Sequence, residues 1–188
     1  AGSQDKQEEM KAETFSKTPA NYHWTALDTI AMPFIFLSRI RHCAGYGVQS
    51  PTDYAFVREV IYNHEAYSLY AELLASCPSA AWMERKIAKL LLRLSNHAQA
   101  ESISVCGQLT PLMRKALHLG CRKSQLLPYS VSAAPSSLIV FTDIRRQGKK
   151  EWERLLQRPN IIAYDLHYLG FAFHKTGRFS EAHIVNFY

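Results

Sequence analysis

Long apolar runs are missing from this sequence. The run Ile30–Leu37 is far shorter than the ~18 consecutive apolar residues of a membrane span, and Arg39 and Arg41 close it. Residues 1–13 are mixed in charge and slightly acidic, whereas a secretory signal opens with basic residues. We therefore expect a cytoplasmic protein with no membrane partner.

Metal-binding spacing is also missing. The sequence has four cysteines but no CxxC pair, and its histidines form neither HxH nor HExxH. We therefore expect no metal site, and the residue pattern assigns no catalytic residue. Cys106 ends a strand-like run just before a helix start, which suits either a reactive thiolate or, as we favour, a buried inert thiol.

Positive charge is unevenly spread along the chain. The formal net charge is +6, yet residues 1–31 hold three basic and five acidic residues, so the remainder carries +8. Such a balance suits either nucleic acid or solvated helix faces. We favour solvated faces, with nucleic acid as an alternative. The basic residues considered were Lys86, Lys89 and Arg93 on one helix, and Arg145, Arg146, Lys149 and Lys150 beside another helix start.

The first third of the chain is expected to be helical after a polar start. Residues 1–31 are interpreted as a partly flexible N-terminal extension, and residues 32–188 as one domain. Apolar residues within 22–40 could form a helix packed on the body, with Pro33 at a break or at its start. Ser50 and Pro51 then provide a capping hydroxyl and a first-turn proline for the next helix.

Strands and helices alternate after residue 98, which predicts an α/β fold: a helical cap over residues 32–98 and a sheet core over residues 99–188. The turn at residues 175–178 is expected to join the last two strands as an antiparallel hairpin. The expected helices span residues 65–75, 81–97, 111–119 and 149–157, and the expected strands span residues 102–106, 125–129, 137–141, 161–166, 170–174 and 183–188.

Three segments resemble class I S-adenosylmethionine-dependent methyltransferases, in particular a branch found in Bacteroidetes. They are HCAGYGVQSPTDYAFV at residues 42–57, KIAKLLLRLSNHAQAESISVCG at 86–107, and SLIVFTDIRRQGKKEWERLLQRPNIIAYDLHYLGFAFHKTG at 137–177. The resemblance covers most of residues 32–188. It implies a Rossmann-like methyltransferase fold with N-terminal helices, and the strand at 137–141 resembles the fifth of the family's sheet. The sequence leaves open whether this strand keeps the fifth position or lies farther inward.

The chain departs from that family where the cofactor would bind. The family's first strand ends in an acid followed by a glycine-rich turn, but here Val105 takes the acid's position and Pro111 that of a glycine. No acid lies within residues 122–129 to hold ribose hydroxyls. Residues 121–136 are too few for the missing βαβ units, because one unit takes ~30 residues. We expect a truncated, mostly parallel sheet with antiparallel C-terminal strands.

These departures leave three functions open. We favour a degenerate, methyltransferase-like binding or scaffold module that needs no cofactor. The first alternative is a divergent active methyltransferase, in which Gly107, Gln108, Thr110 and Asp143 would contact S-adenosylmethionine. Asp143 matches an acid of a metal site in some relatives, but capping the following turn explains it equally well. The second alternative binds nucleic acid through its basic surface. Lost strands would expose an apolar surface or an open sheet edge, so we expect a homodimer.

Overall fold

The computed structural model describes residues 25–65, 67–130 and 137–188. The expected flexibility of residues 1–24 and most of the loop expected at 130–137 therefore concern residues outside the described part. The described helices are α2 (Ala26–Ser38), η1 (Ile40–Gly45), α3 (Pro51–Phe56), η2 (Val57–Ile61), α4 (Leu69–Ala75), α5 (Trp82–Ala98), α6 (Pro111–Gly120) and α7 (Lys149–Leu156).

The strands form one six-stranded mixed sheet in the order β2-β1-β3-β5-β4-β6. Only β5 runs against the others, so the sheet is mostly parallel as expected. The strands are β1 (Ser102–Cys106), β2 (Gln125–Pro128), β3 (Leu138–Phe141), β4 (Ile161–Leu166), β5 (Leu169–His174) and β6 (Glu181–Ile184).

The expected C-terminal hairpin is wrong. The antiparallel hairpin joins β4 to β5 through the two-residue loop His167-Tyr168, in which His167 has a φ of 77°. The last strand, β6, pairs with β4 and runs parallel to it. Arg178 lies in the loop before β6, and its ion pair with Asp53 ties this loop to α3. The strand β6 thus lies on the side of β4 that faces away from β5.

The strand β3 lies directly beside β1. Ile103 pairs with Leu138 and Cys106 with Phe141, all in parallel register. In a doubly wound sheet of six strands, the fifth strand is separated from the first by another strand. In this chain the connection between β2 and β3 is short, and β1 and β3 pair directly with no strand between them.

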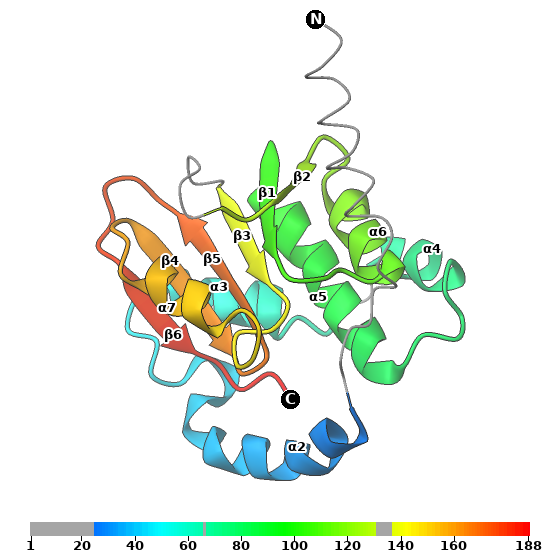
Figure 1. The fold of residues 1–188 in the computed structure, drawn as a ribbon, viewed down its shortest axis with the longest axis horizontal. Helices are drawn as coiled ribbons and strands as arrows, with labels where there is room; N and C mark the ends of the chain where they lie inside the picture. The colour runs from blue at the N-terminus through cyan, green and yellow to red at the C-terminus, as the bar shows by residue number, and fades with distance from the viewer. Residues whose placement is uncertain (1–24, 66, 131–136) are drawn as a thin grey trace, which may run out of the picture.

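Helices cover both faces of the sheet (Figure 1). The helices α3, α5 and α6 pack on one face in a core that includes Ile87, Leu91 and Phe171. The helix α7 covers part of the other face, where Trp152 and Leu155 contact Phe141 and its neighbours. The helix α5 matches its expected span within a residue, because its apolar side chains recur at helical spacing.

The helix α2 differs from the sequence expectation in two ways. Pro33 lies inside the helix, which runs unbroken from residue 26 to 38. Most of its large apolar side chains are exposed and do not pack on the body. A capping box of Thr25 and Asp28 starts the helix. The boundary expected between residues 31 and 32 falls inside α2.

Candidate functional site

Sheets of this kind bind ligands outside the carboxyl ends of their parallel strands, where neighbouring connections leave in opposite directions. In this chain that point lies between β1 and β3, because the connection from β1 leads to β2 on one side and the chain then returns to β3 on the other. The structure brings two predicted site residues together here. Gly107 directly follows β1, and Asp143 follows β3 with only Thr142 between them.

The gap between these two strand ends is filled by Thr142. Gly107 has a φ of 103°, and a Cβ added there would collide with Thr142 Oγ1. Thr142 is 6% exposed, and its backbone N–H donates to the Cys106 carbonyl over 3.1 Å. The glycine thus accommodates this chain's own threonine, which leaves no close approach for a ligand on that side of Gly107.

The start of α6 offers few amides to a ligand. Thr110 is 6% exposed, and its hydroxyl accepts the Met113 N–H over 3.2 Å, so it caps the helix. Pro111 occupies the first turn and has no N–H. Leu109 is buried, whereas Gln108 is exposed. Of the residues predicted after β1, Gly107 and Gln108 face solvent and Thr110 does not.

Asp143 acts as a turn cap. Its Oδ1 accepts the N–H groups of Arg145 and Arg146, each over 3.0 Å. The turn then closes when Gly148 N–H donates to the Asp143 carbonyl. These contacts match the turn-capping interpretation of Asp143.

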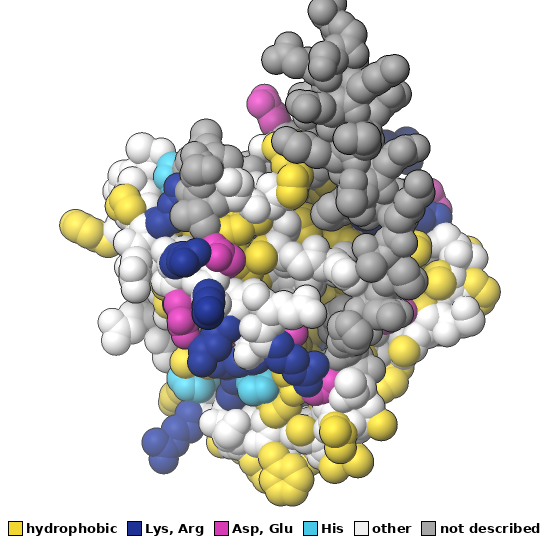
Figure 2. All heavy atoms as spheres, viewed as in Figure 1, with side chains coloured by type: hydrophobic (Ala, Val, Ile, Leu, Met, Phe, Trp, Pro, Cys, Tyr) yellow, Lys and Arg dark blue, Asp and Glu magenta, His cyan; other side chains and the backbone are white. Residues whose placement is uncertain are grey.

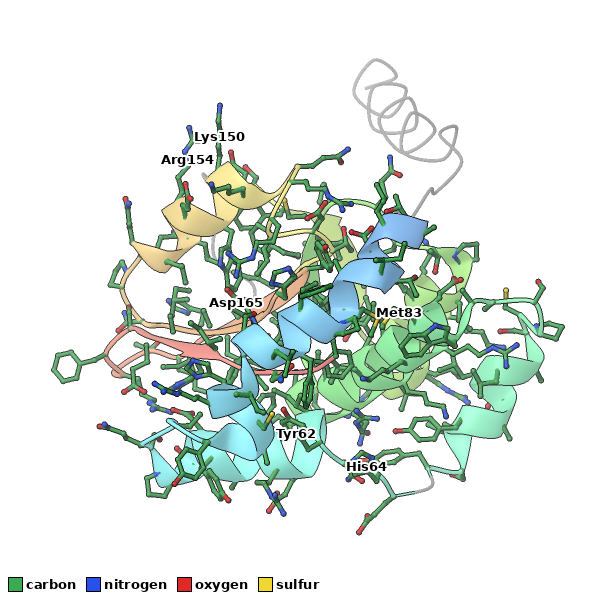
Figure 3. The ribbon with its side chains drawn as sticks, turned by 90° about the horizontal axis from the view of Figure 1, so that it is seen from below. Tyr62, His64, Met83, Lys150, Arg154 and Asp165 are labelled. Carbon is green, nitrogen blue, oxygen red and sulfur yellow. The ribbon has the colours of Figure 1, made fainter. Side chains whose placement is uncertain are left out.

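Two acids farther along this edge, one buried and one half-buried, were not predicted from the sequence. Asp165, near the end of β4, forms ion pairs with Arg39 at 2.6 Å and with Arg145 at 2.9 Å. Asp28 of α2 is 3% exposed and pairs with Arg146. The pairs hold α2 across the carboxyl edge of the sheet, with Asp165 behind it (Figure 3).

These contacts determine the ionisation of the edge. Burial acts to raise the pKa of Asp28, but hydrogen bonds from Thr25, Tyr168 and Arg146 outweigh it and the pKa lies below its usual value. Burial together with the nearby Arg39 and Arg145 lowers the pKa of His167 to about 4. His167 is therefore neutral at pH 7, and the arginines are held by carboxylates.

Cys106, at the end of β1, is a poor nucleophile. Burial and the neighbouring Glu151 carboxylate raise the pKa of its thiol to about 11. Thiol reactivity requires the thiolate, which is scarce at pH 7 with such a pKa. This agrees with the expectation of an inert thiol.

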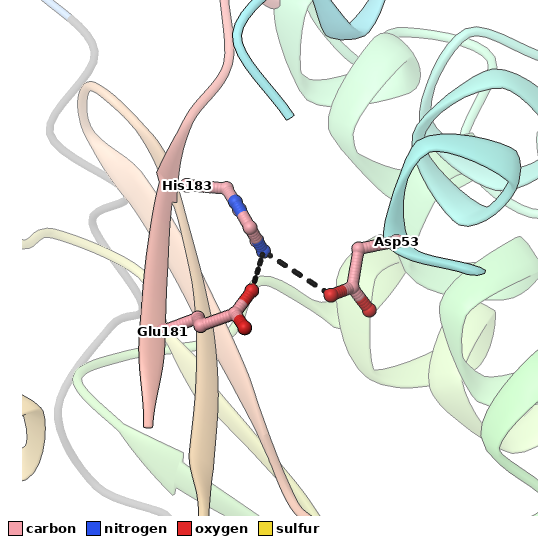
Figure 4. A group of neighbouring side chains, drawn as sticks. All are labelled: Asp53, Glu181 and His183. Atoms are coloured by element: carbon pink, nitrogen blue, oxygen red, sulfur yellow. Dashed lines mark ion pairs between the residues drawn. The ribbon is translucent and has the colours of Figure 1, made fainter. Parts of the chain in front are cut away.

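A second polar cluster joins α3 to β6 (Figure 4). Asp53 is 2% exposed, and Arg178 holds both of its oxygens, at 2.9 and 2.8 Å. Nε2 of His183 lies 3.4 Å from Asp53 and 3.4 Å from Glu181. Burial acts to raise the pKa of Asp53, but hydrogen bonds from Arg178 and Ser50 outweigh it and the pKa is lowered.

This cluster has the donor types of a metal site, since Asp53, Glu181 and His183 each offer one ligand atom within 4.8 Å of the others. Arg178 already supplies a positive charge there, because its guanidinium binds Asp53 and lies 3.9 Å from Glu181. A divalent ion at Asp53 would have to displace this charge or lie against it. The arrangement therefore fits an ion-pair network that docks α3 on β6, with the guanidinium in place of a metal.

A recess of about 610 Å³ lies beside η2, lined in part by Tyr62, His64 and His97 (Figure 3). Arg93 also lines it but is 6% exposed, so its expected place on a solvated helix face is wrong. Its guanidinium donates to the Val60 and Ile61 carbonyls, where the π-helical turns of η2 end, and to a tyrosine hydroxyl. Arg93 therefore has a structural role. Burial lowers the pKa of His97, which also lines the recess.

The basic cluster near α7 is interleaved with acids (Figure 2). Arg145 and Arg146 are committed to Asp165 and Asp28 as described above. Lys149 lies 3.9 Å from Glu153 on the same helix. A surface that tracks phosphates needs cations free to exchange counterions for phosphates, and the paired arginines are less available for this.

No family model, no curated protein and no solved structure matches this chain. Within residues 25–65, 67–130 and 137–188, none of the helices has the length and apolar character needed to cross a membrane.

Proposed function

We propose that this chain is a methyltransferase-like module of Rossmann type that has no methyl-transfer activity and acts by binding. The proposal rests on the contacts among the chain's own side chains at the carboxyl edge of the sheet. Thr142 fills the space beside Gly107, and the charged side chains at that edge are committed to one another. A cofactor would have to break these contacts to enter.

The sequence resemblance supports the methyltransferase part of the proposal. It matches the order β1, glycine turn and α6, and it matches the segment from β3 to β5. The mostly parallel sheet is compatible with that origin. The shortened connection between β2 and β3 and the residues Val105 and Pro111 support a loss of cofactor binding.

A divergent active methyltransferase is the first alternative. It would use Gly107, Gln108, Thr110 and Asp143 to hold S-adenosylmethionine. The contacts described above count against it, because Thr110 caps α6 and Asp143 caps a turn. Binding of nucleic acid is the second alternative, and the ion pairs of Arg145 and Arg146 count against it.

Thermal unfolding with S-adenosylmethionine and S-adenosylhomocysteine tests the proposal. A ligand present at a hundred times its dissociation constant would stabilise the folded chain by about 2.7 kcal/mol. That corresponds to a rise in Tm of roughly 5–10 °C for a chain of this length. We expect no shift with either ligand, while a working methyltransferase measured alongside shifts. A saturable rise in Tm would contradict the proposal.

A further inference from the structure

The outer face of α2 is an exposed apolar surface. Leu27 is 75% exposed, Ile30 67%, Phe34 72% and Leu37 61%. Exposed single apolar residues are common, but four large ones on one face of a helix form a patch that calls for a binding partner. Figure 2 shows hydrophobic side chains along the lower margin of the molecule, where Figure 1 places α2.

The opposite side of α2 is fixed, so this face cannot turn inward. Asp28 pairs with Arg146 and accepts the Tyr168 hydroxyl over 2.8 Å. Ile35 is buried against the body. Just after the helix, Arg39 donates to Asp165 through 2.6 and 2.9 Å contacts. The inner side therefore anchors the helix by its polar groups, and the apolar face points outward in a fixed orientation.

The area of this face suits a protein interface. Even at roughly 200 Å² each, the size of an aromatic side chain, the exposed fractions of Leu27, Ile30, Phe34 and Leu37 amount to at most about 550 Å². A stable interface buries about 800 Å² on each partner. A few flanking residues would supply the difference, so the face alone provides most of what a specific dimer needs.

Spacing and shape point to a second helix of the same kind. Leu27, Ile30, Phe34 and Leu37 follow one another at intervals of three, four and three residues, which is the seam pattern of paired helices. Beside them lies an apolar groove of about 470 Å³, lined by Thr29, Met32, Pro33, Phe36, Leu37 and Tyr188. A two-fold interface joins the same patch on both copies, so the projecting side chains of one copy would face the groove of the other.

The charge of α2 also favours a second copy of this chain over an anionic membrane as the partner. Between Asp28 and Arg39, both buried, the helix carries no charged residue. In a chain of net charge +6, identical copies that meet at this uncharged stretch of the helix avoid like-charge contacts there. Helices that lie on anionic membranes carry Lys and Arg along their polar side. The polar side of α2 instead carries Asp28, which is tied to the body.

We propose that the outer face of α2 forms a two-fold interface with the α2 of a second copy of this chain. This deepens the proposed binding role and rests on it, but the dimer does not require an empty cofactor site. Binding of S-adenosylmethionine by a dimer would refute the proposed function and leave the interface standing. A monomer that binds no cofactor would refute the interface alone.

Sedimentation of the full chain over a wide range of concentration tests the interface. We expect a dimer, and we expect Phe34→Glu to weaken dimerisation by roughly a hundredfold or more, since it places two like charges at the centre of the seam. Phe179→Glu is the matched control, because Phe179 is 91% exposed on the loop before β6, and it should leave the dimer intact. A wild-type monomer, or equal dissociation by both variants, overturns the proposal.

Three further measurements separate the other possible occupants. In air-oxidised protein, Phe34→Cys should form a disulfide between copies and Phe179→Cys should not. If the full chain is a monomer and removal of residues 1–24 makes it dimerise, those residues are the occupant and the proposal fails. It also fails if the wild-type protein is a monomer in solution and co-sediments with phosphatidylserine-containing vesicles, whereas Phe34→Glu does not co-sediment with them.

Discussion

Replacement of Arg178 by methionine should destabilise the fold through the carboxylate that it leaves behind. Asp53 is 2% exposed, and the guanidinium of Arg178 binds both of its oxygens. Methionine has similar bulk but no charge, so the buried carboxylate between α3 and β6 loses the guanidinium that binds both of its oxygens and keeps only Ser50 and His183 nearby. Removing one partner of a buried pair costs about 3–5 kcal/mol. Because Arg178 itself is 29% exposed, we expect about 3 kcal/mol at pH 7.

The pH dependence of this loss has a defined sign. In the wild type the pKa of Asp53 is lowered, so its contribution to stability is complete above the unfolded pKa, roughly 4, and is lost as pH falls through the folded value. Without Arg178, burial still acts to raise this pKa, and the carboxyl takes up a proton more easily. The gap in stability between wild type and variant should therefore narrow as pH falls from the variant's higher folded pKa towards the lowered wild-type value.

Urea unfolding followed by circular dichroism, at neutral pH and at about pH 3.5, measures both effects. The double variant Asp53→Asn, Arg178→Met is the control, since it removes the buried charge with its partner and should lose less than Arg178→Met alone. A loss for Arg178→Met below about 1 kcal/mol at neutral pH, the range of an exposed pair, would refute the reasoning. So would a loss that is the same at both pH values.

Two other substitutions test the carboxyl edge. His167 has a pKa of about 4 in the fold, so wild-type stability should fall by up to about 3 kcal/mol as pH drops from about 6.5 towards 4. Asparagine tolerates the φ of 77° at this position. In urea unfolding, His167→Asn should therefore lack this part of the decline. Gly107→Ala should cost roughly 2 kcal/mol or more in the same assay, because its Cβ would meet Thr142 Oγ1. Gly107→Ala paired with Thr142→Gly should recover part of the loss, and no recovery would show that Thr142 does not fill this gap.

Local features of the fold could be predicted from the sequence. The strand Ser102–Cys106 and the helix Pro111–Gly120 match their expected spans, because short-range signals set them. Such signals include the Thr110 cap and the first-turn proline Pro111. Ser50 likewise caps α3 as its sequence indicates. Each of these depends on residues a few positions apart, and sequence patterns record that range well.

Long-range pairing could not be predicted in this way. Arg39 and Asp165 are 126 residues apart in sequence, and neither stands in a motif that identifies the other. The Arg178–Asp53 pair, which ties the loop before β6 to α3, likewise spans 125 residues. The exposed face of α2 was missed for another reason: the helix is apolar on most sides, so its periodicity does not show which side packs.

The homodimer expected from the sequence is now proposed to form through a different surface. The sequence argument relied on an exposed apolar surface of the sheet or an open sheet edge. Both edge strands are only four residues long, and β2 ends in Pro128. Short edge strands and edge prolines discourage pairing with another chain. The apolar surface that calls for a partner lies on α2.

Isothermal titration calorimetry of the full chain with S-adenosylmethionine tests the central claim most directly. The claim is that the chain's own side chains close the carboxyl edge between β1 and β3. It predicts only the heat of dilution, at every concentration that can be reached. A saturable signal with micromolar affinity would contradict it, and would contradict it most clearly if Gly107→Val abolished that signal without unfolding the chain.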